Sequence, residues 1–145
     1  MTTPEGYNET GRPAWYLNPI TEIKGVQHAL IMTLDGMVQA RSKDLTADEA
    51  DGIAAMTSAM HAASRAAANT ALRAGEDTPI ETVTVKNALG TYMVMPAGPG
   101  TNTLIAAAGD DAMPMGVVAH TMARQAMKLG EQLMSVSVRT NDGAS

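Results

Sequence analysis

Two apolar runs joined by Asp35-Gly36 are the feature that most constrains this chain. The first is Val26 to Leu34, and the second begins at Met37 and ends at Arg41. An Asp-Gly pair between two such runs is a strong short-range signal for a β-hairpin, because glycine accepts the positive φ that the turn requires. Both faces of the first strand are apolar, which predicts a strand inside a sheet with layers on both sides. The second strand is shorter and more polar, as expected for an edge strand.

Helices are predicted on both sides of the hairpin. The first covers residues 15–24 and is closed by Gly25. The second starts at Thr46-Ala47-Asp48-Glu49, which is a capping box because a threonine is followed three residues later by a glutamate. It is expected to run from about 47 to 73 and to stop at Gly75.

The long helix carries alanine on more than one side. Its apolar residues recur at helical spacing at Ile53, Met56, Met60, Ala63 and Ala67. Small residues on several sides predict close packing on two neighbours, the sheet beneath and a second chain above. The alternative is that alanine only raises helix propensity on a solvated face.

The remainder of the chain predicts three more strands and a final helix. The strands are expected at residues 80–86, 89–95 and 103–109. Pro114 stands at the preferred first position of the last helix, whose apolar stripe extends to Leu133. We therefore expect one domain at 14–134, between a disordered N-terminal tail (1–13) and a C-terminal tail (135–145).

Composition narrows the function classes. The net charge is −5 with scattered basic residues, which argues against a nucleic-acid binder, and the absence of cysteine excludes disulfides and thiolate metal sites. No signal core or membrane-length apolar run is present, so we expect a cytoplasmic protein. Phenylalanine is absent while methionine reaches 12 residues. Methionine can fill a core, and it also suits surfaces that re-pack against partners.

No set of residues predicts catalysis or cofactor binding. His28, His61 and His120 fall on separate elements without metal-ligand spacing. The loop Gly98-Pro99-Gly100-Thr101 lacks the Lys-Ser/Thr ending of a phosphate-binding loop and leads into a strand. Asp110-Asp111 precedes a helix, where capping explains paired acids better than catalysis. We expect no enzyme, no cofactor and no metal.

Several short segments, in their order and spacing, resemble the roadblock domain family (dynein light-chain seven type). These are Gly25-Val26, Ala29-Leu30, Asp35-Gly36, Ala54-Ala55, Gly116-Val117-Val118-Ala119 and Gly130-Glu131-Gln132-Leu133. The pattern is most similar to the actinobacterial branch that is encoded beside small Ras-like GTPases and sensor kinases. The resemblance implies an α/β (α+β) sandwich, with about five antiparallel strands, a long helix on one face and the N- and C-terminal helices on the other.

The resemblance also implies a function. Roadblock proteins are homodimeric platforms for small GTPases, so a regulatory or scaffold role is expected, with a GTPase and a sensor kinase as partners. Whether such a protein stimulates GTP hydrolysis stays open. The alternative is a small-molecule sensor of related α/β/α shape. An apolar pocket with converging polar groups would favour the sensor, and a flat exposed Ala/Met surface would favour the platform.

Candidate interface residues follow from the helical spacing and from the strand that the resemblance places at the dimer edge. They are Met56, Met60, Ala63 and Ala67 on the long helix and Ile80, Thr82 and Thr84 on the next strand. Arg65 and Arg73 are candidates for contacting a partner, with solvated helix charges as the alternative reading.

Overall fold

The computed structural model describes residues 14–98 and 100–144, which form a three-layer arrangement around one sheet. The strands lie in the order β2-β1-β5-β4-β3, and every neighbouring pair is antiparallel. Their bounds are β1 Val26–Thr33, β2 Val38–Arg41, β3 Val83–Asn87, β4 Gly90–Pro96 and β5 Thr103–Gly109. The expected tail at 1–13 lies outside the described residues.

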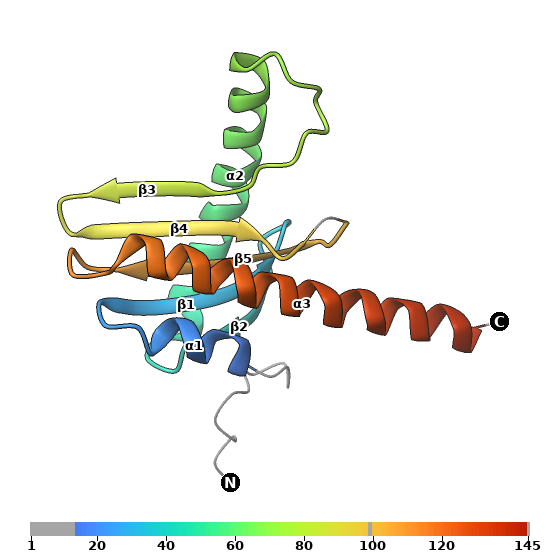
Figure 1. Ribbon diagram of the computed structural model, residues 1–145, viewed down its shortest axis with the longest axis horizontal. Coiled ribbons are helices and arrows are strands. Elements are labelled where there is room, and N and C mark those ends of the chain that lie inside the picture. Colours follow the sequence, from blue (N-terminus) through green and yellow to red (C-terminus); the bar gives the residue numbers. More distant parts are fainter. Residues whose placement is uncertain (1–13, 99, 145) are drawn as a thin grey trace, which may run out of the picture.

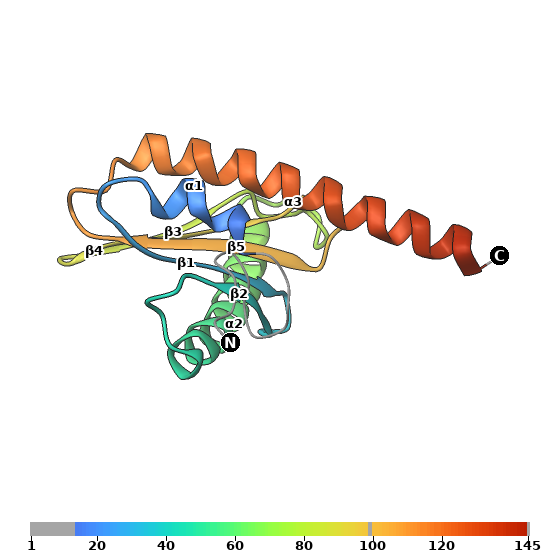
Figure 2. The same ribbon diagram turned by 90° about the horizontal axis from the view of Figure 1, so that it is seen from below.

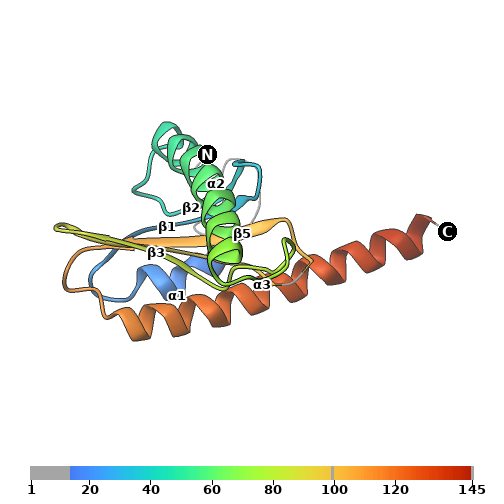
Figure 3. The same ribbon diagram turned by 90° about the horizontal axis from the view of Figure 1, so that it is seen from above.

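The helices divide between the two faces of the sheet (Figure 1, Figure 2). The long helix α2, Ala47–Ala71, crosses one face, and the opposite view shows it alone there (Figure 3). The other face carries a 3₁₀ turn η1 at Trp15–Leu17, a short helix α1 at Asn18–Thr21, and α3 at Met115–Ala144. The predicted fold class and layer order are confirmed. Among the described residues, no helix has the length and apolar character needed to cross a bilayer.

The Asp35-Gly36 hairpin has a three-residue loop. The backbone N–H of Thr33 donates to the carbonyl of Met37 at 2.9 Å, and the N–H of Gly36 donates to the carbonyl of Thr33 at 3.0 Å. Gly36 has a φ of +90°, so this is the left-handed position that closes a three-residue hairpin loop. The predicted β1 position is confirmed, because β1 lies between β2 and β5.

A β-bulge in β2 lets this strand contribute side chains to the apolar clusters on both faces of the sheet. Ile31 pairs with Ala40, but Met32 pairs with Val38, so one residue of β2 is unmatched. Ala40 therefore lies in the cluster on the α3 side, and Val38 packs on the cluster on the α2 side. Without this extra residue, the pleat would send both side chains to the same face.

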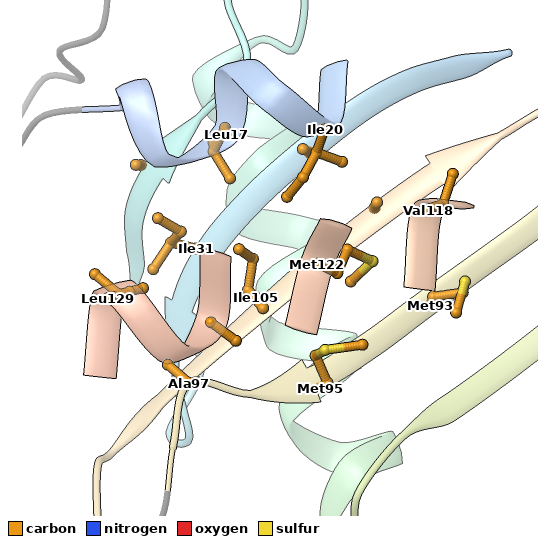
Figure 4. Close-up of a cluster of buried hydrophobic side chains, with 14 of the residues drawn as sticks. Leu17, Ile20, Ile31, Met93, Met95, Ala97, Ile105, Val118, Met122 and Leu129 are labelled. Carbon is orange, nitrogen blue, oxygen red and sulfur yellow. The ribbon is translucent and has the colours of Figure 1, made fainter. Parts of the chain in front are cut away.

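Two apolar clusters hold the layers together, and β1 contributes to both. The cluster between α3 and the sheet includes Leu17, Ile20, Ile31, Met93, Met95, Ala97, Ile105, Val118, Met122 and Leu129 (Figure 4). The cluster beneath α2 contains Leu30, Met32, Leu45, Ala50, Ala54, Val94, Leu104 and Ala106. Buried methionines supply much of the bulk that phenylalanine would otherwise provide.

The first helix and β3 have other bounds than those predicted. The first helix is shorter than residues 15–24, because α1 ends at Thr21 and a turn leads to Gly25. The strand expected at 80–86 begins at Val83, which pairs with Val94. In that register Glu81 would face Pro96, which has no N–H to donate, so the ladder cannot extend toward residue 80.

The last helix is longer than predicted. Residues 135–144, expected as a tail, continue α3 to Ala144 and carry it past the sheet (Figure 1). No proline interrupts this stretch, and glycine first appears in it at position 143. A helix with no breaker can continue where its apolar stripe has already ended.

Gly130 sets how closely α3 can lie on the sheet. A Cβ at this residue would stand 2.0 Å from the carbonyl oxygen of Ala97, which is fully buried. Replacing Gly130 with alanine is expected to lower the free energy of unfolding by about 1–3 kcal/mol, because α3 must move away from the loop. Gly116→Ala on the same helix is the matched control, since its Cβ would meet nothing within 4 Å.

Urea denaturation of both variants measures the difference. Gly116→Ala is expected to be neutral or stabilising, because alanine is the better helix former by about 1 kcal/mol. Equal stability of the two variants would show that α3 does not pack on the Ala97 loop as described.

Candidate functional site

The start of α2 is held by the predicted capping box. The Thr46 N–H donates to the Glu49 Oε1 at 3.0 Å, and the Glu49 N–H donates to the Thr46 hydroxyl at 3.1 Å. The hydrogen bond from the Thr46 backbone, followed by that from its hydroxyl, lowers the pKa of Glu49. A charged Glu49 near the positive end of the helix dipole favours this start point.

The hairpin loop anchors the middle of α2. The Ser58 hydroxyl donates to the carbonyl of Leu34 at 2.5 Å. A Cβ on Gly36 would lie 3.3 Å from both the Ala54 carbonyl oxygen and the Ala55 Cα, so the loop passes close to the helix backbone. The Asp35-Gly36 turn therefore positions the long helix as well as joining two strands.

Only part of α2 is buried against the sheet. Ala50, Ala54, Thr57 and His61 are buried at successive spacings of four, three and four residues. Thr57 shares a 2.7 Å hydrogen bond with the Tyr92 hydroxyl on β4, the strand next to the edge. Burial raises the pKa of Tyr92, and the bond to Thr57 opposes that rise.

The second half of α2 extends past the edge of the sheet (Figure 1). A helix of 25 residues is about 37 Å long at 1.5 Å per residue. Five strands span about 19 Å across their four spacings of about 4.8 Å. Accordingly, every residue from Ala62 to Ala68 is exposed or half-buried. We call the stretch from Ala62 to Ala71 the overhang.

From Gly52 onward, the outer side of α2 presents small and uncharged side chains to solvent. The exposed residues on this part of the outer side are Gly52, Ala55, Met56, Ala59, Ala62, Ala63, Ala66, Ala67 and Thr70, whereas the start of the helix exposes the acidic Asp48, Glu49 and Asp51. Met56 is 68% exposed. Arg65 lies on another side, because it follows the buried His61 by four residues. A solvated helix normally carries charge on its outer side, so this surface is typical of a helix that packs on a partner.

β3 forms the edge of the sheet beside the overhang. Its residues Thr84 to Asn87 are exposed, and β4 is its neighbour on one side. Val85 is 45% exposed and lies on the α2 face, because it pairs with Tyr92. No proline occurs in the strand, so its outer N–H and C=O groups can pair with another strand.

The predicted interface residues fall around these two surfaces. Met56, Ala63 and Ala67 are exposed on α2, while Met60 is half-buried and packs on the cluster beneath the helix. Of the strand residues, Thr84 lies within β3. Ile80 and Thr82 precede the strand, in the segment that returns from α2, so their assignment to the strand is corrected.

Asn69 is a structural residue that the sequence reading missed. It is buried near the end of α2, and its amide donates to the carbonyls of Thr78 at 3.0 Å and Glu76 at 3.3 Å. These bonds tie the returning segment to the helix. The signal in the sequence is a polar residue on a helix shortly before a loop, which is too common to single it out.

The two candidate arginines occupy different settings. Arg65 is exposed on the overhang, whereas Arg73 lies beyond the end of α2. The helix ends at Ala71, earlier than the predicted 73, and Arg73 rather than Gly75 takes the left-handed conformation, with a φ of +55°. The Ala74 N–H donates to the Asn69 carbonyl at 2.8 Å, which closes the helix end.

The histidines and paired acids have local surroundings. His28 on β1 lies 3.4 Å from the Asp44 carboxylate, measured from Nδ1 to Oδ2, and His120 is exposed on α3. Asp110 accepts from the Ala112 N–H at 2.8 Å, in the turn before α3 rather than as its cap. Within residues 14–98 and 100–144, no group of three or more His, Asp or Glu side chains is placed to hold a metal ion.

Among the comparisons with known proteins, one family model matches this chain. The family model described as Roadblock/LC7 domain matches residues 16–107. A search of curated proteins found no match.

Solved structures share the fold at low sequence identity. A Roadblock/LC7 domain from Streptomyces avermitilis is 23% identical, with a TM-score of 0.72 over 83% of this chain and 96% of that chain. The gliding protein MglB from Thermus thermophilus is 20% identical, with a TM-score of 0.68 over 81% and 84% of the two chains. MglB from Myxococcus xanthus is 11% identical, with a TM-score of 0.69 over 83% and 94%.

The left-handed Arg73 generates a stability prediction. Arg73→Gly is expected to raise the free energy of unfolding by about 0.5–1 kcal/mol, because glycine adopts this conformation without the roughly 1–2 kcal/mol cost that a Cβ imposes. Arg73→Ala is the control, since it removes the charge but keeps the Cβ. If urea denaturation shows no gain for glycine over alanine, the helix end is not closed at Arg73.

Proposed function

Because the chain belongs to the Roadblock/LC7 domain family, we propose that it is a non-enzymatic regulatory protein that acts as a homodimer. In this proposal a second copy of the chain covers the edge strand β3 and the flank of α2 that carries Met56, Met60, Ala63 and Ala67, and the rest of the outer side stays open. The partner of the dimer is a small Ras-like GTPase.

The overhang is the observation that carries the dimer. It carries ten of the 25 residues of α2 beyond β3, with small uncharged residues on its outer side (Figure 1). If β3 pairs with its copy, the two sheets become one, and each overhang lies over the neighbouring sheet. Small residues allow two helices to approach to the closer end of the usual 8–10 Å interaxial distance. A single two-fold axis would therefore pair the free N–H and C=O groups of β3 and cover the overhang, because a two-fold interface brings the same surface of both chains together.

The paired helices would then form the surface that receives the GTPase. A regulator can shift the nucleotide state of its partner only by binding one state more tightly than the other. Arg65 and Arg73 are the cations we propose to contact the acidic side of that partner. We further propose a cytoplasmic location, membership in the actinobacterial branch, and a link to a sensor kinase.

The structure favours this platform over the small-molecule sensor. The sensor needs an apolar pocket between a helix and the sheet. Both of these interfaces are occupied by closely packed apolar side chains, among them Ile105, Val118 and Met122 on one side and Leu30 and Leu104 on the other. The exposed Ala/Met surface of α2 is the feature expected of a platform.

Ala63→Glu tests the dimer. A carboxylate in the centre of a close-packed helix pair has no partner there, and burying it costs several kcal/mol. The variant is expected to run as a single chain in light scattering, while the unaltered protein has the mass of two. Ala123→Glu is the matched control, because it places the same substitution on the exposed side of α3.

An unchanged mass for Ala63→Glu would overturn the proposed interface. Loss of the dimer in Ala123→Glu as well would show that added negative charge, rather than its position on α2, disrupts assembly. Circular dichroism of both variants confirms that each keeps its helices.

Binding to a small Ras-like GTPase tests the partner, and a GTPase encoded beside this gene would be the first choice. With the GTPase loaded with GDP or with a GTP analogue, we expect at least tenfold tighter binding in one state, which corresponds to about 1.4 kcal/mol. Arg65→Ala and Arg73→Gly are each expected to weaken that binding. The affinity of each variant should also fall less steeply with rising salt concentration than that of the unaltered protein. Absence of binding in either state, measured by calorimetry, would contradict this proposal.

A further inference from the structure

His61 occupies the point at which α2 leaves the sheet. It is 7% exposed, and every residue from Ala62 to Ala68 is less buried. It follows Thr57, which is bonded to Tyr92 on β4, by one helical turn. His61 therefore lies beneath α2 immediately before the overhang.

The imidazole of His61 has an unsatisfied buried atom. Among the described residues, no hydrogen-bond partner reaches its Nε2, and this atom has no solvent contact. A buried polar atom without a partner costs free energy, and the cost rises sharply if the ring becomes charged. Burial, followed by the positive charge of Arg65, lowers the pKa of His61, so the ring is neutral at pH 7.

The surroundings offer this ring no compensating negative charge. Arg65, on the same helix, is the charged side chain that acts on it. From the sheet, Tyr92 contributes a phenol whose pKa is raised and which is therefore neutral. Lys86 lies on the other face of β3, because it pairs with Thr91. The acidic residues of the returning segment, Glu76, Asp77 and Glu81, are all exposed.

We propose that His61 makes the dimer sensitive to pH, so that its protonation releases the overhang and separates the two chains. This inference rests on the homodimer proposed above. A protonated ring can gain water only if α2 lifts from the sheet beside β3. In a single chain the overhang is free to lift, whereas in the dimer it is held over the neighbouring sheet. Protonation therefore favours the single chain.

The direction of the effect follows from linkage. The pKa of His61 is lower in the folded chain, where α2 lies on the sheet, than the ordinary value of 6.5, so this packed form binds fewer protons than a form in which α2 has lifted. The proposed dimer holds α2 in the packed form. Its stabilisation is complete above pH 6.5 and is lost as the pH falls below that value. Each dimer contains two copies of His61, so the two effects multiply in the dissociation constant.

Sedimentation equilibrium between pH 7.5 and 5.5 tests the proposal. The dissociation constant of the unaltered protein is expected to rise at least tenfold over this interval, and that of His61→Gln less than threefold. His120→Gln, which alters an exposed histidine on α3, is the matched control and should retain the full rise. A full rise in His61→Gln, or a constant value in the unaltered protein, would overturn the role of His61.

Two further readouts separate the possible failures. A single-chain mass at pH 7.5 would overturn the dimer itself, whereas a dimer with a pH-independent constant overturns only the switch. If His61→Gln does not fold, NMR titration of the ring protons in the unaltered protein still decides. The His61 midpoint is expected below the ordinary value of 6.5, and a midpoint at or above that value would contradict the proposal.

Discussion

The mismatch between the length of α2 and the width of the sheet governs the rest of this structure. A helix of about 37 Å cannot be covered by a sheet of about 19 Å, so about half of it must find another surface or remain solvated. The helix cannot slide to share its length between both edges, because its start and middle are anchored. Leu45, just before the helix, is buried in the cluster beneath α2, and the bond from Ser58 to Leu34 ties the helix to the hairpin. All of the excess therefore emerges at the β3 edge.

The hairpin has a larger role in this arrangement than a chain reversal. Its bulge sends Val38 to one layer and Ala40 to the other, and β1 supplies Leu30 and Ile31 to opposite clusters. One two-sided strand thus joins both apolar clusters. Gly36 adds the close approach to α2, because a side chain there would crowd the helix backbone. The orientation of the overhang consequently depends on a turn at the far side of the sheet.

Sequence patterns predicted the turns and helix starts that depend only on residues close together in the chain. The Asp-Gly turn, the capping box and the apolar periodicity of α2 each act within a few residues, and the first two are confirmed at atomic detail. Features that depend on distant residues were missed. β3 begins at Val83 because Pro96 lies opposite residue 81, and α2 ends before Arg73 although Gly75 looked like the better stop. The interface residues themselves stay predictions, because helical spacing gives a face but not what covers it.

The composition of the overhang also indicates how a dimer would be stabilised. Alanine buries little apolar area, so a helix pair built from Ala63, Ala66 and Ala67 gains close approach and dispersion contacts rather than a large hydrophobic term. Area must then come from the larger side chains at the margin, Met56 and Met60, and directionality from the unpaired groups of β3. Neither contribution suffices alone, since an isolated edge pairing and an alanine seam are each weak. Because the overhang and β3 lie side by side at one edge of the sheet, a single interface with a second chain can bury both of them.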